Sequence, residues 1–217
     1  MDQALDIAPS DYWRWHLIAN APESSDAAFT WEEFQASVNS DLANVLGNFV
    51  NRITKYCVGK FDGKVPAGGE NGEAEAWLIK ELETRLPQLV AYYEAREFRK
   101  AMAETRAIWA AGNEYLTQAA PWTHYKTDVD QAAVGVRVGL NLVALFGVIA
   151  QPIIPDAAEK ILAAMNIPDV NRTWDFRGAS AIDALPIGLE ISAPDVLFTK
   201  IEDTDIEDWT QRFGGGA

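Results

Sequence analysis

The sequence contains little cysteine, little histidine and few basic residues. It has one cysteine, Cys57, and two histidines, so neither an internal disulfide nor a Cys/His zinc site can form within the chain. Its 18 lysines and arginines are outnumbered by 32 aspartates and glutamates, which gives a net charge of −14. Taken alone, this charge argues against nonspecific binding to nucleic acid or to an anionic membrane, although an acidic protein can still carry a locally basic site.

Targeting and membrane-spanning patterns are also missing. The N-terminus, Met-Asp-Gln, has no charged-then-apolar leader. The most apolar stretch, residues 132–154, is interrupted by Arg137, Asn141, Gln151 and Pro152. Polar side chains and a proline inside the stretch favour a buried core helix over a membrane span. We therefore expect a cytoplasmic protein without a membrane partner.

The signatures of common catalytic sites are absent. There is no G-x-x-x-x-G-K-[ST] loop, no G-x-G-x-x-G after a predicted strand, and no G-x-S-x-G elbow. His16 and His124 could act as bases, but a single histidine beside aromatic residues is more often packed or at the surface. The residues by themselves therefore indicate no active site, no cofactor and no metal site.

Helical periodicity dominates what is present. Hydrophobic residues make up 48% of the chain, which is enough for a packed core. The clearest helix begins at Thr30, where Glu33 completes a capping box, and ends near Gly59. Its apolar residues recur at steps of three or four: Phe34, Val38, Leu42, Val45, Phe49, Ile53 and Tyr56. Other helices are predicted over residues 10–20, 73–93, 97–119, 128–152 and 155–165, and Pro87 should kink or interrupt the second of these.

The character of the sequence changes from Ile167 onward. Proline and glycine recur, and short apolar runs such as Leu189-Glu190-Ile191 indicate extended segments. A final helical turn is expected at residues 206–209. The pattern therefore predicts an all-α fold with an irregular C-terminal tail.

Two places carry residues that could touch a ligand. Asn48 and Arg52 lie four residues apart on the long helix and share one face, with Lys55 near the same side. Trp122 follows Ala120-Pro121 at a helix break, where a large ring is often presented at an edge. Asparagine can read a base edge, arginine can pair with a base or a phosphate, and tryptophan can stack on an unpaired base. From spacing alone, a helix with polar flanks and a core tryptophan is the better interpretation.

At these residues the sequence resembles a known family, the C-terminal half of bacterial methionyl-tRNA synthetase, a class I aminoacyl-tRNA synthetase. The resemblance covers almost the whole chain. Residues 10–17 (SDYWRWHL) resemble the region after the family's catalytic signature loop, and residues 26–34 (DAAFTWEEF) resemble the entry to its anticodon-binding helices. Residues 38–52 (VNSDLANVLGNFVNR) carry the characteristic helix with its N-x-x-x-R pattern, and Ala120-Pro121-Trp122 is the second hallmark.

The resemblance implies an antiparallel helical bundle that binds the anticodon. In the family, an Asn and an Arg on the first long helix and a Trp after the third recognise the CAU anticodon of methionine tRNA, and these positions fall on Asn48, Arg52 and Trp122. The family's Rossmann domain uses ATP through His-Ile-Gly-His-like and Lys-Met-Ser-Lys-Ser-like motifs, and this sequence has neither. We therefore expect anticodon recognition without catalysis by this chain alone, next to the catalytic domain of the synthetase as a partner.

Two further expectations follow from the resemblance. Residues 1–29 should link to a catalytic domain, residues 30–166 should form the anticodon-binding bundle, and residues 167–217 should pack back on it. A basic face should surround Arg52 to attract phosphates, with these candidates for phosphate contacts: Lys55, Lys60, Arg96, Arg99 and Lys100. Two alternatives stay open, a helical scaffold that has lost its RNA function and a half that works only with a separate catalytic chain.

Overall fold

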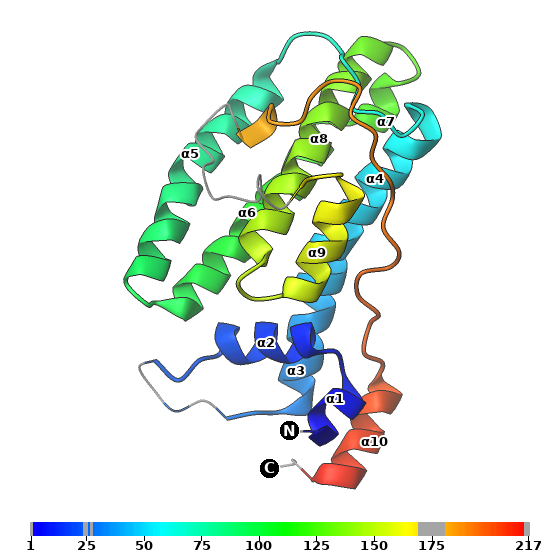
Figure 1. The fold of residues 1–217 in the computed structure, drawn as a ribbon. Coiled ribbons are helices and arrows are strands. Elements are labelled where there is room, and N and C mark those ends of the chain that lie inside the picture. The colour runs from blue at the N-terminus through cyan, green and yellow to red at the C-terminus, as the bar shows by residue number, and fades with distance from the viewer. Residues whose placement is uncertain (1, 24–25, 27, 169–180, 215–217) are drawn as a thin grey trace.

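The computed structural model describes residues 2–23, 26, 28–168 and 181–214, and it confirms an all-α bundle with an irregular C-terminal tail (Figure 1). In chain order, the helices of this part are α1 (Asp2–Ile7), α2 (Ser10–Ala19), α3 (Trp31–Ser37), η1 (Val38–Gly47), α4 (Asn48–Lys60), α5 (Glu73–Glu94), α6 (Phe98–Ala119), α7 (Pro121–His124), α8 (Val129–Ala150), α9 (Pro155–Ala164) and α10 (Asp203–Phe213). Each predicted helix is present, and α1 and the short α7 are helices that the sequence pattern did not predict.

The long helix predicted from Thr30 is built from three consecutive elements, α3, η1 and α4. The Thr30 hydroxyl caps it by accepting a hydrogen bond from the Glu33 backbone N–H at 3.1 Å. Its middle part, η1, is π-helical, so its hydrogen bonds connect residues five apart and widen the turn. The buried side chains of η1 therefore recur at steps of four, and Leu46 is buried where the sequence pattern predicted Val45.

Helices α5 and α6 form an antiparallel hairpin along one side of the bundle (Figure 1). A kink or an interruption was expected at Pro87; the interruption is wrong, because α5 is helical from Glu73 to Glu94. Pro87 lies on the exposed side of the helix, so the carbonyl group that loses a backbone donor faces water. The start of α5 is fixed by the buried Glu75 carboxylate, which accepts from the Gly72 N–H at 2.7 Å and from the Tyr115 hydroxyl at 2.6 Å.

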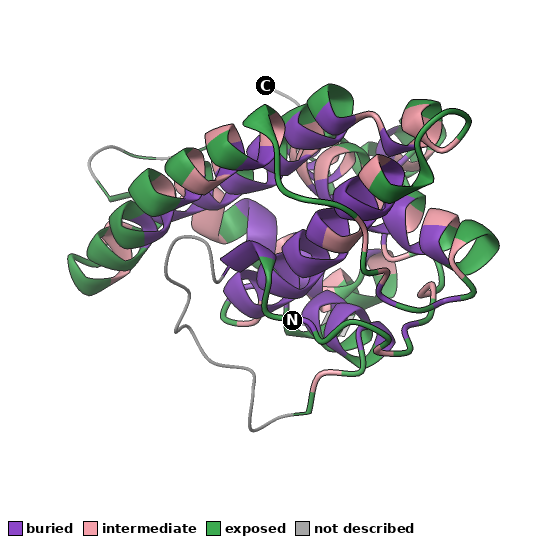
Figure 2. Cartoon of the chain, turned by 90° about the horizontal axis from the view of Figure 1, so that it is seen from above, coloured by how far each residue is buried: buried purple, intermediate pink, exposed green. Residues whose placement is uncertain are grey.

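Helix α8 fills the centre of the bundle. Nearly all residues from Ala132 to Ala150 are buried. Figure 2 shows that buried turns lie inside the bundle and that the outer faces of its helices are exposed. Among the described residues, it is the one helix that is long and apolar enough to cross a membrane by length and composition, and 94% of its most apolar window is buried inside the protein. This burial is the arrangement expected of the core helix that the interrupted apolar stretch predicted.

Helix α2 fastens the N-terminal part of the chain to the bundle. The buried Asp11 carboxylate accepts hydrogen bonds from the Asp156 and Ala157 N–H groups at the start of α9, at 3.4 and 2.7 Å. The Arg14 guanidinium donates to the Ile153 carbonyl at 2.6 Å, just before that helix. Trp15 stacks on Trp109 of α6 with ring centroids 4.9 Å apart. These contacts therefore attach α2 to both α6 and α9.

The described part of the C-terminal tail crosses the bundle as an extended strap and ends in α10 (Figure 1). The Asn39 side chain holds the strap through two hydrogen bonds with Ile201. Its Nδ2 atom donates to the Ile201 carbonyl at 2.8 Å, and its Oδ1 atom accepts from the Ile201 N–H at 2.9 Å. Helix α10 is longer than the single turn predicted at residues 206–209, and its Trp209 packs against Trp31 at 5.3 Å between centroids. Part of the predicted tail, residues 169–180, lies outside the described residues, and the domain boundaries stay predictions.

Candidate nucleic-acid interface

The corner between α6 and α7 places Trp122 at the edge of the bundle. Ala120 ends α6 in the left-handed region, at φ 37° and ψ 54°, and also begins α7. A non-glycine residue in this region carries a strain of about 1–3 kcal/mol, which the surroundings must offset. Pro121 is buried and anchors the corner, whereas Trp122 is only half-buried. The turn thus leaves part of the indole ring accessible.

Arg52 and Trp122 are in direct contact. The Arg52 guanidinium carbon lies 4.5 Å from the centroid of the Trp122 ring, which is a cation–π geometry. Tyr56, one turn further along α4, meets the Trp122 ring edge-on at 6.1 Å and 86°. Two residues that are 70 positions apart in the sequence therefore form one cationic and aromatic surface.

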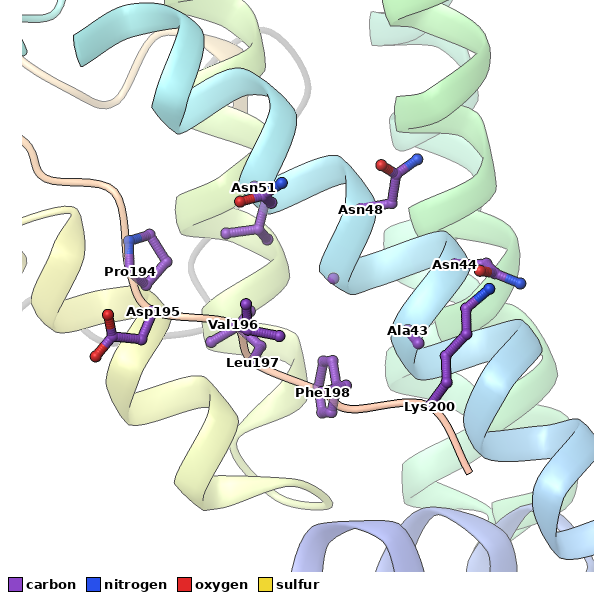
Figure 3. Close-up of a pocket in the computed structure, with 12 residues that line it drawn as sticks. Ala43, Asn44, Asn48, Asn51, Pro194, Asp195, Val196, Leu197, Phe198 and Lys200 are labelled. Carbon is purple, nitrogen blue, oxygen red and sulfur yellow. The ribbon is translucent and has the colours of Figure 1, made fainter. Parts of the chain in front are cut away.

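Asn48 lies one helical turn before Arg52 and borders a neighbouring groove. The groove has a volume of about 340 Å³ and runs between the start of α4 and the strap, where Pro194 to Phe198 and Lys200 form its other wall (Figure 3). The Asn48 side chain is exposed, and no side-chain hydrogen bond joins it to another described residue. Figure 3 shows the Asn48 side chain pointing away from the strap, so its amide is available to a ligand on the exposed face of α4.

Three more cations surround the same end of α4. Lys55 is exposed beside Arg52, Lys60 places its ammonium 5.3 Å from the Tyr125 ring centroid, and Lys126 follows in the chain. In the described part of the chain, no carboxylate lies within 4.0 Å of the charged groups of these lysines or of Arg52. These cations are free to meet a polyanion, in spite of the negative charge of the whole molecule.

Arg96, Arg99 and Lys100 lie at the other end of the bundle. They occupy the tip of the α5–α6 hairpin, whereas Trp122 follows the opposite end of α6 (Figure 1). Helix α6 has 22 residues, so its two ends are separated by about 33 Å. The Lys100 ammonium pairs with Glu97 at 2.8 Å. The expected single basic face is therefore wrong: the candidate cations form two separate groups, because α6 runs the length of the bundle.

Sequence reasoning missed the aromatic residues that complete this surface. The helical pattern places Tyr56 in the apolar stripe, but its side chain is half-buried and contacts both Trp122 and Tyr125. A signal was present, since Arg52, Tyr56 and Lys60 recur at steps of four and so share one face of α4. Tyr125 gave no signal, because it faces Lys60 only through the tertiary fold.

His16 is a packed histidine, as expected of a single histidine beside aromatic residues. His16 is buried, with its Nδ1 atom 3.0 Å from the Ser37 hydroxyl oxygen and its ring edge-on to Phe29 and Phe34. Burial lowers the pKa of His16, which keeps the imidazole neutral in its aromatic pocket. In the described ranges, no three His, Cys, Asp or Glu side chains gather in a group that could hold a metal ion. The surface at α4 and α7 is thus equipped for stacking and charge pairing, the contacts that bind unpaired nucleotides.

Comparison with protein families places two models on the chain. The model described as the anticodon binding domain of methionyl tRNA ligase matches residues 65–217, more than half of the sequence. The model described as tRNA synthetases class I (M) matches residues 1–54. The second model covers α2 and extends into α4, so it includes Asn48 and Arg52, whereas Trp122 lies within the first.

Similar curated proteins cover the entire chain. Methionine–tRNA ligase of Hyphomonas neptunium is 68% identical over 223 residues, which is 100% of this chain and 38% of that protein. Methionine–tRNA ligase of Maricaulis maris is 70% identical over 217 residues, which is 99% of this chain and 38% of that protein. The chain therefore spans well under half the length of the curated relatives it matches.

Solved structures share the fold at lower identity. Methionyl-tRNA synthetase of Mycobacterium tuberculosis in its apo form matches with a TM-score of 0.82 and 23% identity, over 92% of this chain and 40% of that one. The same enzyme bound by methionyl-adenylate matches with a TM-score of 0.81 and 23% identity, over 91% of this chain and 39% of that one. On the strength of the family match across residues 65–217, the chain belongs to the anticodon-binding domains of the methionyl-tRNA ligases.

Proposed function

We propose that this chain recognises the CAU anticodon of methionine tRNA through Asn48, Arg52 and Trp122. The contact of Arg52 with Trp122, at 4.5 Å, is the observation that carries the proposal. It joins the two segments that the family resemblance marked, and it does so on an accessible edge of the bundle. Lys55 and Lys60 of the same helix have no carboxylate partner in the described structure, which would favour a polyanion at this edge.

The chemistry of the three residues suits an unpaired RNA loop. The Trp122 ring can stack on one base, which contributes about 1–3 kcal/mol in single-strand complexes. Arg52, held against that ring, is positioned to pair with a neighbouring base edge or phosphate. Asn48, one turn away, offers a donor and an acceptor to a base edge.

The recognition site would serve the methionine–tRNA ligase reaction together with a catalytic domain in the cytoplasm. The parent family uses ATP in that domain, and we assign no cofactor to the present chain. The contacts of α2 with α6 and α9 support such an arrangement, because they would fix the anticodon site relative to the N-terminal segment. Charging of methionine tRNA after addition of a separate catalytic chain would show that the domain works in trans.

A paired measurement tests the proposal. The affinity of the chain for a methionine-anticodon stem-loop is compared with that for the same stem-loop carrying a permuted anticodon, for the wild type and for Trp122→Ala. We expect the wild type to prefer CAU and Trp122→Ala to bind about tenfold or more weakly, which corresponds to about 1.4 kcal/mol. Its melting temperature should fall less than for a core tryptophan, whose removal costs about 3–5 kcal/mol. Equal affinity for both anticodons would refute the proposal.

A further inference from the structure

A second cation–aromatic pair lies next to the first. Lys60 is above the Tyr125 ring with its ammonium 5.3 Å from the centroid, in the same way that Arg52 is above Trp122. Both cations come from α4, eight residues apart, and both rings come from the α7 corner, three residues apart. Tyr56 lies between the pairs and meets the Trp122 and Tyr125 rings edge-on, each at 6.1 Å between centroids.

The second pair has the properties of a ligand surface. Tyr125 is half-buried and Lys60 is exposed. Phe61 supports the Tyr125 ring edge-on at 5.6 Å, so the ring is held in place from the side. Lys60 has no carboxylate within 4.0 Å among the residues that the structure describes, and Lys126 adds a second exposed ammonium beside Tyr125. A ring flanked by unpaired cations is the arrangement that holds a base together with its phosphate.

We propose that Lys60 and Tyr125 form a second nucleotide subsite, which binds the unpaired nucleotide next to the one that stacks on Trp122. This inference rests on the proposed function and extends it. The base stacks on Tyr125, and the Lys60 ammonium moves from the ring face to the phosphate between the two nucleotides. An exposed cation–π contact is weaker than the stacking of a base combined with a phosphate contact, so the exchange favours the bound state.

The competing role for Tyr125 is structural. Its hydroxyl lies 3.5 Å from the Lys60 carbonyl oxygen and could simply tie α7 to the end of α4. The two roles respond differently to substitution. Tyr125→Phe removes the hydroxyl contact and keeps the ring, whereas Tyr125→Leu removes the aromatic face and keeps an apolar side chain.

The experiment crosses these variants with RNA stem-loops that carry the CAU loop and one abasic nucleotide at each loop position in turn. We expect Tyr125→Phe to bind like the wild type and Tyr125→Leu to bind about tenfold more weakly. At one loop position, the losses of binding free energy caused by the abasic change and by Tyr125→Leu should not be additive. This position should differ from the one at which the abasic change and Trp122→Ala are not additive. Lys60→Ala should make the salt dependence less steep by about 0.7 in log–log slope, whereas Lys80→Ala on α5 is the control that leaves it unchanged.

The outcomes separate this inference from the proposed function. If Tyr125→Leu and Lys60→Ala bind as the wild type does while Trp122→Ala fails, the second subsite is refuted and the anticodon function stands. Additive losses at every abasic position would show that Tyr125 acts through the fold, which also refutes the subsite. A wild type that binds no stem-loop overturns the anticodon function and the second subsite with it.

Discussion

At the scale of single residues, the Arg52–Trp122 contact shows how an accessible ring can be kept in order without being buried. A partly exposed indole ring would lose rotamer freedom when it binds a base, which opposes binding. The guanidinium 4.5 Å from the ring centroid and the edge of Tyr56 restrict the ring beforehand. Arg52→Ala is therefore expected to weaken stacking on Trp122 as well as to remove a charge.

Asp11 is the residue whose charge state is most directly coupled to the packing of α2 on α9. Burial raises the pKa of its carboxyl group, although hydrogen bonds from the Ala157 and Asp156 N–H groups act in the opposite direction. A folded-state pKa above the unfolded value means that the unfolded chain releases this proton first. The stabilisation is complete below the unfolded value of about 3.9 and is lost as the pH rises through the raised pKa.

The prediction concerns the difference between Asp11→Asn and the wild type. Asparagine keeps an oxygen that can accept from the α9 backbone and has no proton to release, so the variant should gain stability relative to the wild type as the pH rises from about 3 to 6. Asp11→Ala should lose about 0.5–2 kcal/mol at every pH, because the two N–H groups lose their acceptor. Urea unfolding across this pH range measures both. A relative loss for Asp11→Asn with rising pH would mean that the hydrogen bonds outweigh burial.

At the scale of the elements, close packing of α4 against α8 sets the position of the candidate site on the polar face of α4. Gly139 of α8 lies directly against Ile53 of α4: a Cβ atom added at Gly139 would be 2.7 Å from the Ile53 Cγ1 atom. Ile53 is one residue from Arg52, so a shift of α4 away from α8 would move the candidate site. The small residue therefore contributes to the position of the site as well as to the density of the core.

Gly139→Ala and Gly59→Ala are expected to have opposite effects on stability. Both glycines lie in helices, where alanine is intrinsically better by about 0.8–1 kcal/mol. At Gly139 the added methyl group overpacks the α4–α8 contact, so we expect a net loss of about 1–3 kcal/mol. At Gly59 nothing lies within 4 Å of the added atom, so the variant should be neutral or more stable. Thermal unfolding of the two variants measures both effects. A Gly139→Ala variant more stable than the wild type would show that α4 can move away from α8 without a cost in stability.

At the scale of the whole molecule, a net charge of −14 must be reconciled with binding to a polyanion. The answer lies in how the charges are distributed, because the cations at the end of α4 have no carboxylate partners in the described structure, whereas Arg85, Lys100, Arg106 and Arg212 are paired elsewhere. Repulsion from the rest of the surface is screened beyond about 8–10 Å at moderate salt. A local group of cations can thus dominate the field that a loop of RNA meets.

We predict that the affinity for a CAU stem-loop depends on salt only through this end of the bundle. Each phosphate contact adds roughly −0.7 to the slope of log affinity against log salt, so contacts by Arg52, Lys55, Lys60 and Lys126 would give about −3 at most. Arg99→Ala, at the far tip of the α5–α6 hairpin, should leave the slope unchanged in a stem-loop assay. A slope that changes with Arg99→Ala and not with Lys55→Ala would show that the RNA binds at the hairpin tip, which contradicts the prediction.

The second prediction at this scale concerns catalysis. We expect no methionine-dependent exchange of pyrophosphate into ATP by the pure chain, because its sequence carries none of the nucleotide-binding signatures of the parent family. The exchange assay is run with a catalytically competent ligase at equal concentration as the positive control. Exchange above background by the chain alone would contradict this expectation.

Much of this architecture could be predicted from the sequence, because helices depend on local interactions. The capping box at Thr30 and the apolar stripe located the long helix, and the break at Ala120-Pro121 located the corner before Trp122. The spacing of Asn48 and Arg52 placed both on one face, since the helical repeat is a local property of the backbone. Their link to RNA came only from the resemblance to a family, because the spacing alone favoured a packed helix.

Only the tertiary structure decided which of these residues meet. The sequence does not reveal that Arg52 covers Trp122, that Lys60 covers Tyr125, or that Arg96, Arg99 and Lys100 lie at the opposite end of α6. It also does not distinguish Gly139 from Gly59, although one touches Ile53 and the other faces open space. The physical reason is that helix formation is governed by neighbours within four residues, whereas a binding surface is formed by side chains that packing brings together from distant parts of the chain.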